Sequence, residues 1–202
     1  MRTRMFFAGT ILLFVGLTAI AQPDDQGAKK FILEVGDRAP AFESKDEGGL
    51  TWRSADHLGK KFIVVYLYPG DFTPGCITQA LKFKENMNKL YDQGAEVVGV
   101  SGDSAKTHAL FKDTYKLTYT LIADEKGELA KKFGVPVGSG ALVKKILQDK
   151  ERTKLEFKRD VTLARWTFII GLDGKIVYKN TKVDPVKDSQ QIEMFLKNQE
   201  KK

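Results

Sequence analysis

The sequence is poor in the residues that build disulfides and metal sites. Its 202 residues include a single cysteine, Cys76, and two histidines, His57 and His108. One cysteine cannot close a disulfide within the chain, and it excludes the zinc and redox motifs that need cysteine pairs. The histidines lie far apart with no ligand spacing around them, so we expect neither a metal site nor a cofactor.

The sequence also lacks a strong excess of one charge. It has 33 lysines and arginines against 26 aspartates and glutamates, for a formal net charge of +7. Residues 144–159 hold the densest group of basic side chains, but acidic residues interrupt this group and no ladder of aromatic residues accompanies it. We therefore interpret the segment as a solvated face and expect no nucleic-acid partner. The basic residues are Lys144, Lys145, Lys150, Arg152, Lys154, Lys158 and Arg159.

The long apolar run of the sequence is confined to the N-terminus. Arg2 and Arg4 precede an apolar stretch, residues 5–20, and the segment ends in Ala19-Ile20-Ala21. A positive start, an apolar middle and a small-x-small end are the three parts of a secretory signal. We predict a signal peptide over residues 1–21, cleaved after Ala21, and a linker over residues 22–34. The protein would then be exported, in a bacterium to the periplasm. The alternative is an uncleaved membrane anchor, for which the run is short.

From residue 35 onward, apolar runs alternate with helical patterns. Residues 62–68, FIVVYLY, are continuously apolar and rich in β-branched side chains, as in a central strand covered on both faces. Further strands are predicted at 96–101, 119–123, 167–171 and 175–178, and helices after Cys76, at 105–116, at 127–133 and around 192–196. A hairpin is expected at residues 46–49. We therefore predict one α/β domain over residues 35–202, with a mixed central sheet flanked by helices and an N-terminal hairpin.

Residues 136–160 are the least patterned stretch of this domain. We interpret them as an insertion that precedes the predicted strand at 167–171. Within it, the mostly apolar run at 142–147 predicts a short helix.

The segment before Cys76 places the thiol at the start of a helix. Thr73 fits the N-cap and Pro74 the first helical position, so Cys76 falls at the third. Backbone N–H groups are unpaired there and the helix dipole is positive, which favours a thiolate over a thiol. The sulfur shares the inward face of the helix and is expected to point into a sheltered pocket. Two alternatives are open: Cys76 as a small buried apolar residue, and Thr73 as an ordinary cap. The inward face is predicted to comprise Ala80, Phe83, Met87, Leu90 and Tyr91.

Pro69, Thr73 and Cys76 together match the motif P-x-x-x-T-x-x-C. On this motif, and on the blocks VGDRAPAFES, VVGVSGDSAKTHALFKD, YTLIADEKGELAKKFGV and RWTFIIGLDGKI, the sequence resembles the peroxiredoxins. It is most similar to their Q-type branch, the bacterioferritin comigratory proteins. The resemblance covers about residues 35–180, and it implies a thioredoxin-like fold for the domain.

The resemblance implies a role for each residue of the site. Cys76 would be the nucleophile that attacks a peroxide and becomes a sulfenic acid. Thr73 and the arginine before a late strand, Arg165, would stabilise the charge on the leaving oxygen, and Pro69 would shield the sulfur from water. The expected partners are a peroxide substrate and an external thiol reductant, either a small thiol or a thioredoxin-like protein. We expect a monomer or a weak homodimer.

The sequence departs from the Q-type pattern at three places. Leu81 stands where many members carry a second, resolving cysteine, so an outside thiol must regenerate the sulfur in a one-cysteine enzyme. Gln79 stands where glutamate is usual, and a neutral amide cannot form an ion pair with an arginine. Ile77 replaces the usual threonine, and the segment before Arg165 is longer than is typical.

Other functions suit parts of the same pattern. The missing second cysteine and Gln79 are also compatible with a thioredoxin-like binding module or a peroxide sensor that does not turn over. Thiol–disulfide exchange is disfavoured, because Thr73 stands where a C-x-x-C motif needs sulfur. A cysteine hydrolase would need a histidine near Cys76, and neither His57 nor His108 has a visible orienting partner in the sequence.

Overall fold

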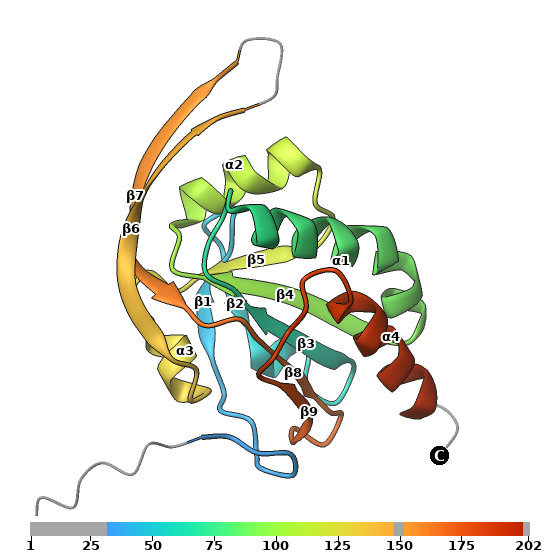
Figure 1. Cartoon of the computed structure of the whole chain (residues 1–202). Coiled ribbons are helices and arrows are strands. Elements are labelled where there is room, and N and C mark those ends of the chain that lie inside the picture. The colour runs from blue at the N-terminus through green and yellow to red at the C-terminus, as the bar shows by residue number, and fades with distance from the viewer. Residues whose placement is uncertain (1–31, 148–151, 200–202) are drawn as a thin grey trace, which may run out of the picture.

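A computed structural model describes residues 32–147 and 152–199 of the chain. At its centre, five strands lie in the order β5 (Thr120–Ala123), β4 (Ala95–Ser101), β3 (Phe62–Leu67), β8 (Trp166–Ile170) and β9 (Ile176–Asn180) (Figure 1). Strands β3, β4 and β5 are parallel to one another, whereas β8 is antiparallel to β3, and β9 is antiparallel to β8. The predicted mixed central sheet is confirmed.

The side chains of β3 alternate between two buried clusters, one on each face of the sheet. Val64 and Tyr66 belong to the first cluster, and Ile63 and Val65 belong to the second. All four are at most 1% exposed. A strand that is covered on both faces needs apolar residues at every position, which explains the unbroken apolar run in the sequence.

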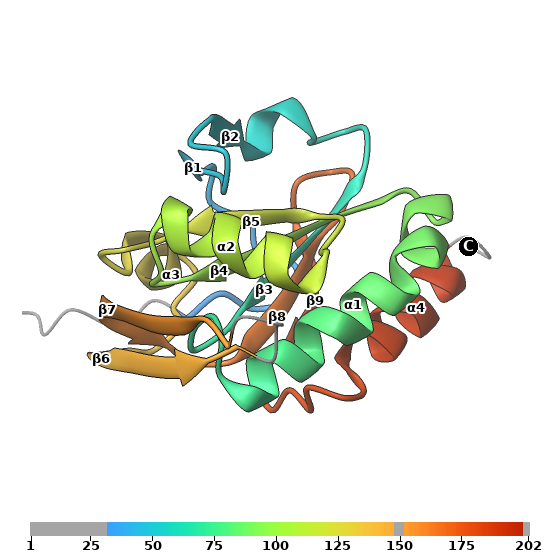
Figure 2. The ribbon, with the colours of Figure 1, turned by 90° about the horizontal axis from the view of Figure 1, so that it is seen from above.

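Helices cover both faces. The first cluster includes side chains of α1 (Pro74–Asp92), α2 (Ala105–Tyr115) and α4 (Asp188–Gln199), and α1 lies side by side with α4 (Figure 2). The second cluster includes α3 (Glu128–Lys132) and the N-terminal segment with Phe42 and Trp52. The predicted inward face of α1 is wrong for one residue, Tyr91. Tyr91 is 65% exposed, because it lies at the end of α1, where its ring meets the Lys61 ammonium, 5.0 Å from the ring centroid, instead of the core.

The expected N-terminal hairpin is formed by β1 (Glu43–Lys45) and β2 (Thr51–Arg53), which a short 3₁₀ helix, η1 (Ser54–Asp56), follows. Asp46 stabilises the turn, since its Oδ1 accepts hydrogen bonds from the N–H groups of Gly48 and Leu50 at 2.9 and 2.8 Å. Leu33, which falls within the predicted linker, is fully buried in the second cluster. The packed domain therefore includes residue 33.

The predicted signal peptide, residues 1–21, and the linker up to residue 31 lie outside the described residues. Among the residues that the structure does describe, no helix is long and apolar enough to cross a membrane.

Most of the predicted insertion, residues 136–160, is part of a long antiparallel hairpin. It consists of β6 (Val137–Ile146) and β7 (Lys154–Leu163), and it reaches beyond the body of the domain (Figure 1); we call it the β6–β7 arm. The predicted short helix at 142–147 is wrong, because residues up to 146 belong to β6. The partner strand supplies the reason: Leu155 and Phe157 are half-buried and alternate with exposed residues, a period of two that is typical of a strand.

Candidate active site

Cys76 lies in the first turn of α1, directly after the loop that leaves β3. Thr73 occupies the N-cap position with φ −86° and ψ 145°, and Pro74 is the first helical residue, as predicted. Cys76 is 1% exposed. Because the first N–H groups of a helix have no partner within the helix, the sulfur sits at the positive end of the α1 dipole.

The side chain of Thr73 does not close the helix cap. Its Oγ1 donates a hydrogen bond to the carbonyl oxygen of Gly70 at 3.0 Å, and it accepts none from the backbone of α1. The hydroxyl proton is thus committed to Gly70, and the lone pairs of Oγ1 are left to accept.

Arg165 reaches the sulfur from the connection between β7 and β8. Its Nη2 donates a hydrogen bond to Sγ of Cys76 at 3.1 Å. The structure therefore brings together two residues that the sequence analysis paired only by resemblance. A guanidinium can only donate, so the sulfur is the acceptor of this bond.

Gln79 and Asp188 continue this contact into the core. Gln79 Oε1 accepts a short hydrogen bond from Arg165 Nη1, and Gln79 Nε2 donates to Oδ2 of Asp188 at 2.7 Å. Thr167 Oγ1 donates to the same oxygen at 2.8 Å. Burial raises the pKa of Asp188 to about 6, although its two hydrogen bonds and the charge of Arg165 favour the ionised form. The two donors on Oδ2 thus favour the carboxylate form against the cost of burial.

Comparison with known families decides the membership of the chain. A sequence model of the AhpC/TSA family matches residues 35–179. The chain belongs to the AhpC/TSA family. Among curated relatives, peroxiredoxin Q of Suaeda salsa chloroplasts is 46% identical over 101 residues, which are 50% of this chain and 47% of the relative. Peroxiredoxin Bcp of Bacillus subtilis is 33% identical over 157 residues, 77% of this chain and 89% of the relative. The chain spans about half the length of the chloroplast relatives that it matches.

Solved structures share the fold of this AhpC/TSA protein. Peroxidoxin BcpB of Mycobacterium tuberculosis aligns with a TM-score of 0.68 at 24% identity, covering 82% of this chain and 97% of its own. Peroxiredoxin Q of Xanthomonas campestris aligns with a TM-score of 0.65 at 25% identity, covering 84% and 98%. The predicted thioredoxin-like fold and the predicted family are confirmed.

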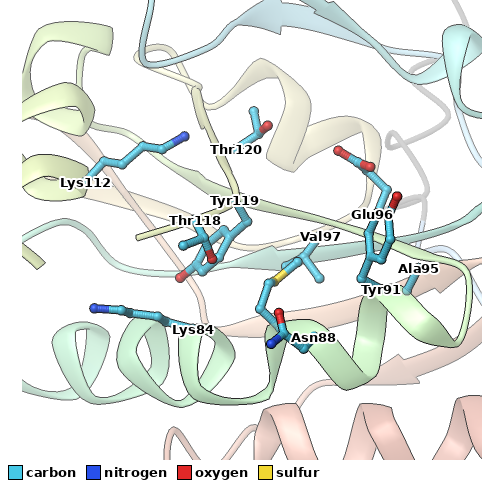
Figure 3. A pocket seen from close by; sticks show the side chains of 11 residues that line it. Lys84, Asn88, Tyr91, Ala95, Glu96, Val97, Lys112, Thr118, Tyr119 and Thr120 are labelled. Atoms are coloured by element: carbon cyan, nitrogen blue, oxygen red, sulfur yellow. The ribbon is translucent and has the colours of Figure 1, made fainter. Parts of the chain in front are cut away.

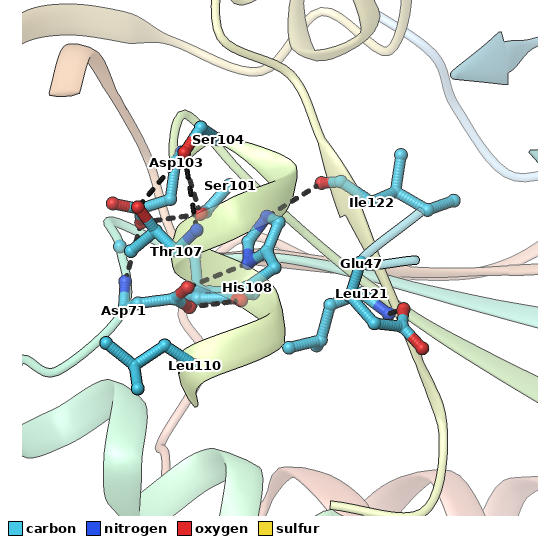
Figure 4. A network of polar contacts seen from close by, with 12 residues as sticks. Glu47, Asp71, Ser101, Asp103, Ser104, Thr107, His108, Leu110, Leu121 and Ile122 are labelled. Carbon is cyan, nitrogen blue, oxygen red and sulfur yellow. Dashed lines mark hydrogen bonds and ion pairs between the residues drawn. The ribbon is translucent and has the colours of Figure 1, made fainter. Parts of the chain in front are cut away.

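A buried polar network holds the loop before Cys76 in this AhpC/TSA protein, and the sequence analysis missed it (Figure 4). Asp71 Oδ1 accepts a hydrogen bond from the Tyr68 hydroxyl, and its Oδ2 lies 2.8 Å from Nδ1 of His108. Nε2 of His108 lies 3.2 Å from the carbonyl oxygen of Ile122, so both ring nitrogens face acceptors. Burial alone would lower the pKa of His108, but the Asp71 and Asp103 carboxylates and the Ile122 carbonyl together raise the pKa.

Neither histidine is placed to activate Cys76. His108 uses both ring nitrogens in the contacts with Asp71 and Ile122. His57 stacks on Trp52, with 4.6 Å between the ring centroids. The cysteine hydrolase considered from the sequence therefore finds no histidine base in the described part of the chain.

Arg159 ties the β6–β7 arm to the same loop. Its Nη1 and Nη2 donate to the carbonyl oxygens of Pro69 and Asp71 at 3.0 and 2.9 Å. Its Nε lies 3.1 Å from Oδ1 of Asp103. A methyl group on Gly70 would lie 1.3 Å from Arg159 Nη1, so a larger residue at 70 would displace the guanidinium. Arg159 is 3% exposed, and its prediction as part of a solvated face is wrong because it points inward in the two-residue alternation of β7.

Phe72 connects this loop to the helix. It has φ 60°, a left-handed conformation that bulky residues rarely adopt. Its carbonyl oxygen accepts a hydrogen bond from Lys145 Nζ at 3.1 Å, and its ring packs edge-on against Phe111 and Phe157. The arm and α2 thus hold the strained residue together. The carbonyl of Pro69 is likewise held by the arm, and shielding of the sulfur by the Pro69 ring stays a prediction.

The substitution Arg159→Met is expected to lower the free energy of unfolding by about 3–5 kcal/mol, because the Asp103 carboxylate would remain buried without its cation. Urea unfolding followed by circular dichroism measures the loss. Lys158→Met is the matched control, since this neighbour on β7 has a side chain that is 75% exposed. A loss below about 1 kcal/mol, the level of an exposed ion pair, would contradict the anchoring role of Arg159.

A separate groove of about 470 Å³ lies between α1 and the starts of β4 and β5 (Figure 3). Lys84, Asn88 and Tyr91 line it from the helix, and Glu96 and Thr120 line it from the strands. The residues around the sulfur are not among those that line it. This groove is therefore no part of the candidate active site.

Proposed function

We propose that the chain is a thiol-dependent peroxidase that reduces hydrogen peroxide or organic hydroperoxides at Cys76. The observation that carries the proposal is the 3.1 Å contact between Arg165 Nη2 and the sulfur at the positive end of α1. The AhpC/TSA membership and the relatives named peroxiredoxins support the same activity.

In the proposed reaction, the Cys76 thiolate attacks one peroxide oxygen along the O–O axis. The S–O bond forms as the O–O bond breaks, so sulfur loses two electrons and the peroxide gains them. The second oxygen leaves as hydroxide or alkoxide and takes up a proton to become water or an alcohol. Arg165 is in place to donate to the oxygens as charge moves onto them. Thr73 Oγ1, whose proton is bound to Gly70, can accept the O–H of the peroxide and orient it.

The depth of the sulfur suits a small oxidant. Cys76 is 1% exposed, whereas Thr73, Gly75 and Arg165 are half-buried. The sulfur is thus shielded from solvent, whereas Arg165, which contacts it, is partly open to solvent. A peroxide that carries a bulky group would have to displace more of this cover than hydrogen peroxide does.

Regeneration requires a second molecule. Cys76 is the only cysteine in the 202 residues, so the sulfenic acid cannot form a disulfide within the chain. An external thiol attacks the sulfenic sulfur, which forms a mixed disulfide and releases water. A second thiol then displaces Cys76 and leaves the oxidised reductant as a disulfide. A small thiol or a thioredoxin-like protein fits this role.

Peroxide consumption by the purified protein tests the proposal. Without thiol, each chain should consume a single equivalent, because Cys76 is oxidised once. With dithiothreitol, consumption should continue for many equivalents. Oxidation that stops after one turnover with dithiothreitol, glutathione and thioredoxin would contradict the peroxidase and favour a peroxide sensor. No oxidation of Cys76 at all would contradict both functions.

We also propose export of the mature chain, in a bacterium to the periplasm, after removal of residues 1–21. The support is the sequence of the leader, with Arg2 and Arg4 before an apolar run and Ala21 at its end. N-terminal sequencing of the mature protein checks this: a start at Gln22 agrees with the proposal, and a start at Met1 contradicts it.

A further inference from the structure

Arg165 depends on a correctly oriented partner on the side away from the sulfur. Its Nη2 contacts Cys76, and its Nη1 donates to Oε1 of Gln79. An amide can present either its oxygen or its NH₂ group, and only the oxygen can accept a hydrogen bond from a guanidinium. The contact between Arg165 and Cys76 therefore depends on what fixes the orientation of the Gln79 amide.

Asp188, the first residue of α4, fixes that orientation. An ionised carboxylate has no proton to donate, so Gln79 must turn its Nε2 toward Asp188 and its Oε1 toward Arg165. Thr167 donates to the same carboxylate oxygen and holds it in place. Gln79, Asp188 and Thr167 are all 0% exposed, so bulk water does not compete for these bonds.

Stability alone does not account for Asp188. Its second oxygen, Oδ1, is buried and has no hydrogen-bond partner among the residues that the structure describes. Burying a carboxylate with an unsatisfied oxygen is unfavourable, and burial raises the pKa of Asp188 to about 6. A buried polar group that lowers the free energy of unfolding in this way is explained by a role other than stability.

We propose that Asp188 is a positioning residue of the sulfur site, which acts through Gln79 to hold Arg165 against Cys76. The inference rests on the proposed function in one respect: it assumes that Arg165 takes part in the oxidation of Cys76. The amide at position 79 follows from the same contacts. A glutamate there would place two carboxylates within hydrogen-bond distance of each other, whereas the amide matches a donor on one side and an acceptor on the other.

The first test removes the carboxylate. In Asp188→Ala the Gln79 amide loses the acceptor that holds its Nε2, so Arg165 alone orients it. The rate of Cys76 oxidation by hydrogen peroxide should then fall roughly tenfold, the usual cost of losing the partner that orients a functional group. A second readout needs no peroxidase activity: the rate of alkylation of reduced Cys76 by iodoacetamide, measured against pH. This profile should differ from that of the original protein, because Arg165 is no longer held against the sulfur.

The matched control is Ser189→Ala. Ser189 is the next residue of α4, is equally buried, and donates its hydroxyl to the carbonyl oxygen of Lys82 at 3.0 Å, outside the chain of contacts that leads to the sulfur. This variant should leave the oxidation rate and the alkylation profile unchanged. A similar slowing in Ser189→Ala would mean that general loosening of α4, and not loss of the carboxylate, is responsible.

The second test moves the carboxylate instead of removing it. In the double variant Gln79→Glu/Asp188→Asn, the new glutamate accepts from Arg165, and the new asparagine donates to the glutamate and to the Thr167 hydroxyl. Oxidation and alkylation should both return to within roughly threefold of the original protein, as expected for residues that act as one unit. Gln79→Glu alone places the new carboxylate beside that of Asp188, and the two repel each other. Cys76 should therefore be oxidised more slowly in this variant than in the double variant.

Two outcomes would overturn the inference. One is Asp188→Ala with unchanged oxidation and an unchanged alkylation profile; the other is a double variant no faster than Asp188→Asn. If Asp188→Ala does not fold, the comparison of Gln79→Glu/Asp188→Asn with Asp188→Asn still tests the inference, because these two variants keep the size of the side chains. If the protein does not turn over peroxide but the alkylation profile moves in Asp188→Ala and returns in the double variant, the proposed function fails and the positioning role stands.

Discussion

Replacement of Cys76 by serine is expected to abolish peroxide consumption with any thiol reductant. The substitution exchanges one atom and keeps the position at the start of α1. The hydroxyl is far less acidic than a thiol, so an oxygen nucleophile is scarcely formed at neutral pH. No other cysteine can replace it, because the chain has one. Peroxide consumption with dithiothreitol should therefore equal that of the buffer.

Thr78→Ser is the matched control for this variant. Thr78 lies two residues further along α1, and its Oγ1 donates to the carbonyl oxygen of Pro74 at 3.1 Å, a bond that serine can keep. The control should turn over peroxide at the rate of the original protein. Substantial turnover by Cys76→Ser would show that the reaction takes place elsewhere and would remove the basis of the proposed function.

Arg165→Met is expected to slow the oxidation of Cys76 by about 10²- to 10³-fold, the loss typical of removing a preorganised donor from a developing charge. Methionine fills similar space but has no donor for the sulfur, for Gln79 or for the peroxide. Stopped-flow mixing of reduced protein with hydrogen peroxide measures the rate constant directly.

Arg165→Lys separates charge from geometry in the same experiment. An ammonium keeps the positive charge but lacks the planar pair of nitrogens that reaches the sulfur and Gln79 together. Its rate should fall between those of the original protein and Arg165→Met. If Arg165→Met were oxidised within about threefold of the original rate, well short of the loss expected for such a donor, Arg165 would have no part in the reaction.

Local signals were enough to predict the sheet and the position of the sulfur. The two faces of β3 are both buried, so every position of the strand needs an apolar side chain and the sequence shows a continuous apolar run. Thr73 and Pro74 mark the start of α1 because backbone geometry at a helix start depends on a few adjacent residues. The third helical position of Cys76 followed from the same two residues.

The supports of the site could not be predicted because they join distant parts of the chain. Gln79 and Asp188 are 109 positions apart, and Asp71 and His108 are 37 apart. One sequence displays the types of these residues but not which of them meet. Asp188 gave only one local signal, an acidic residue at the start of the predicted closing helix, which is an ordinary feature of helices.

Charge patterning failed for Arg159 for a related reason. The density of lysines and acidic residues around it correctly describes its immediate neighbours, since Lys158 and Asp160 are exposed. It is wrong for Lys145 of the same predicted face, which is half-buried and binds the carbonyl of Phe72. The two-residue alternation of a strand reverses that environment at each step, so one residue within a solvated run can be the one that points inward. Only the contacts of β7 with the loop before Cys76 and with Asp103 reveal which residue this is.

The link between the β6–β7 arm and the loop before Cys76 limits how the protein can be engineered. Insertions are ordinarily the segments that tolerate shortening, but here Arg159 and Lys145 bind three carbonyls of that loop, those of Pro69, Asp71 and Phe72. A chimera that takes a shorter connection from a homologue would lose these cations along with the extra length. Such a chimera would need other hydrogen-bond donors for the carbonyls of the loop; without them, the thiol of Cys76 would be displaced.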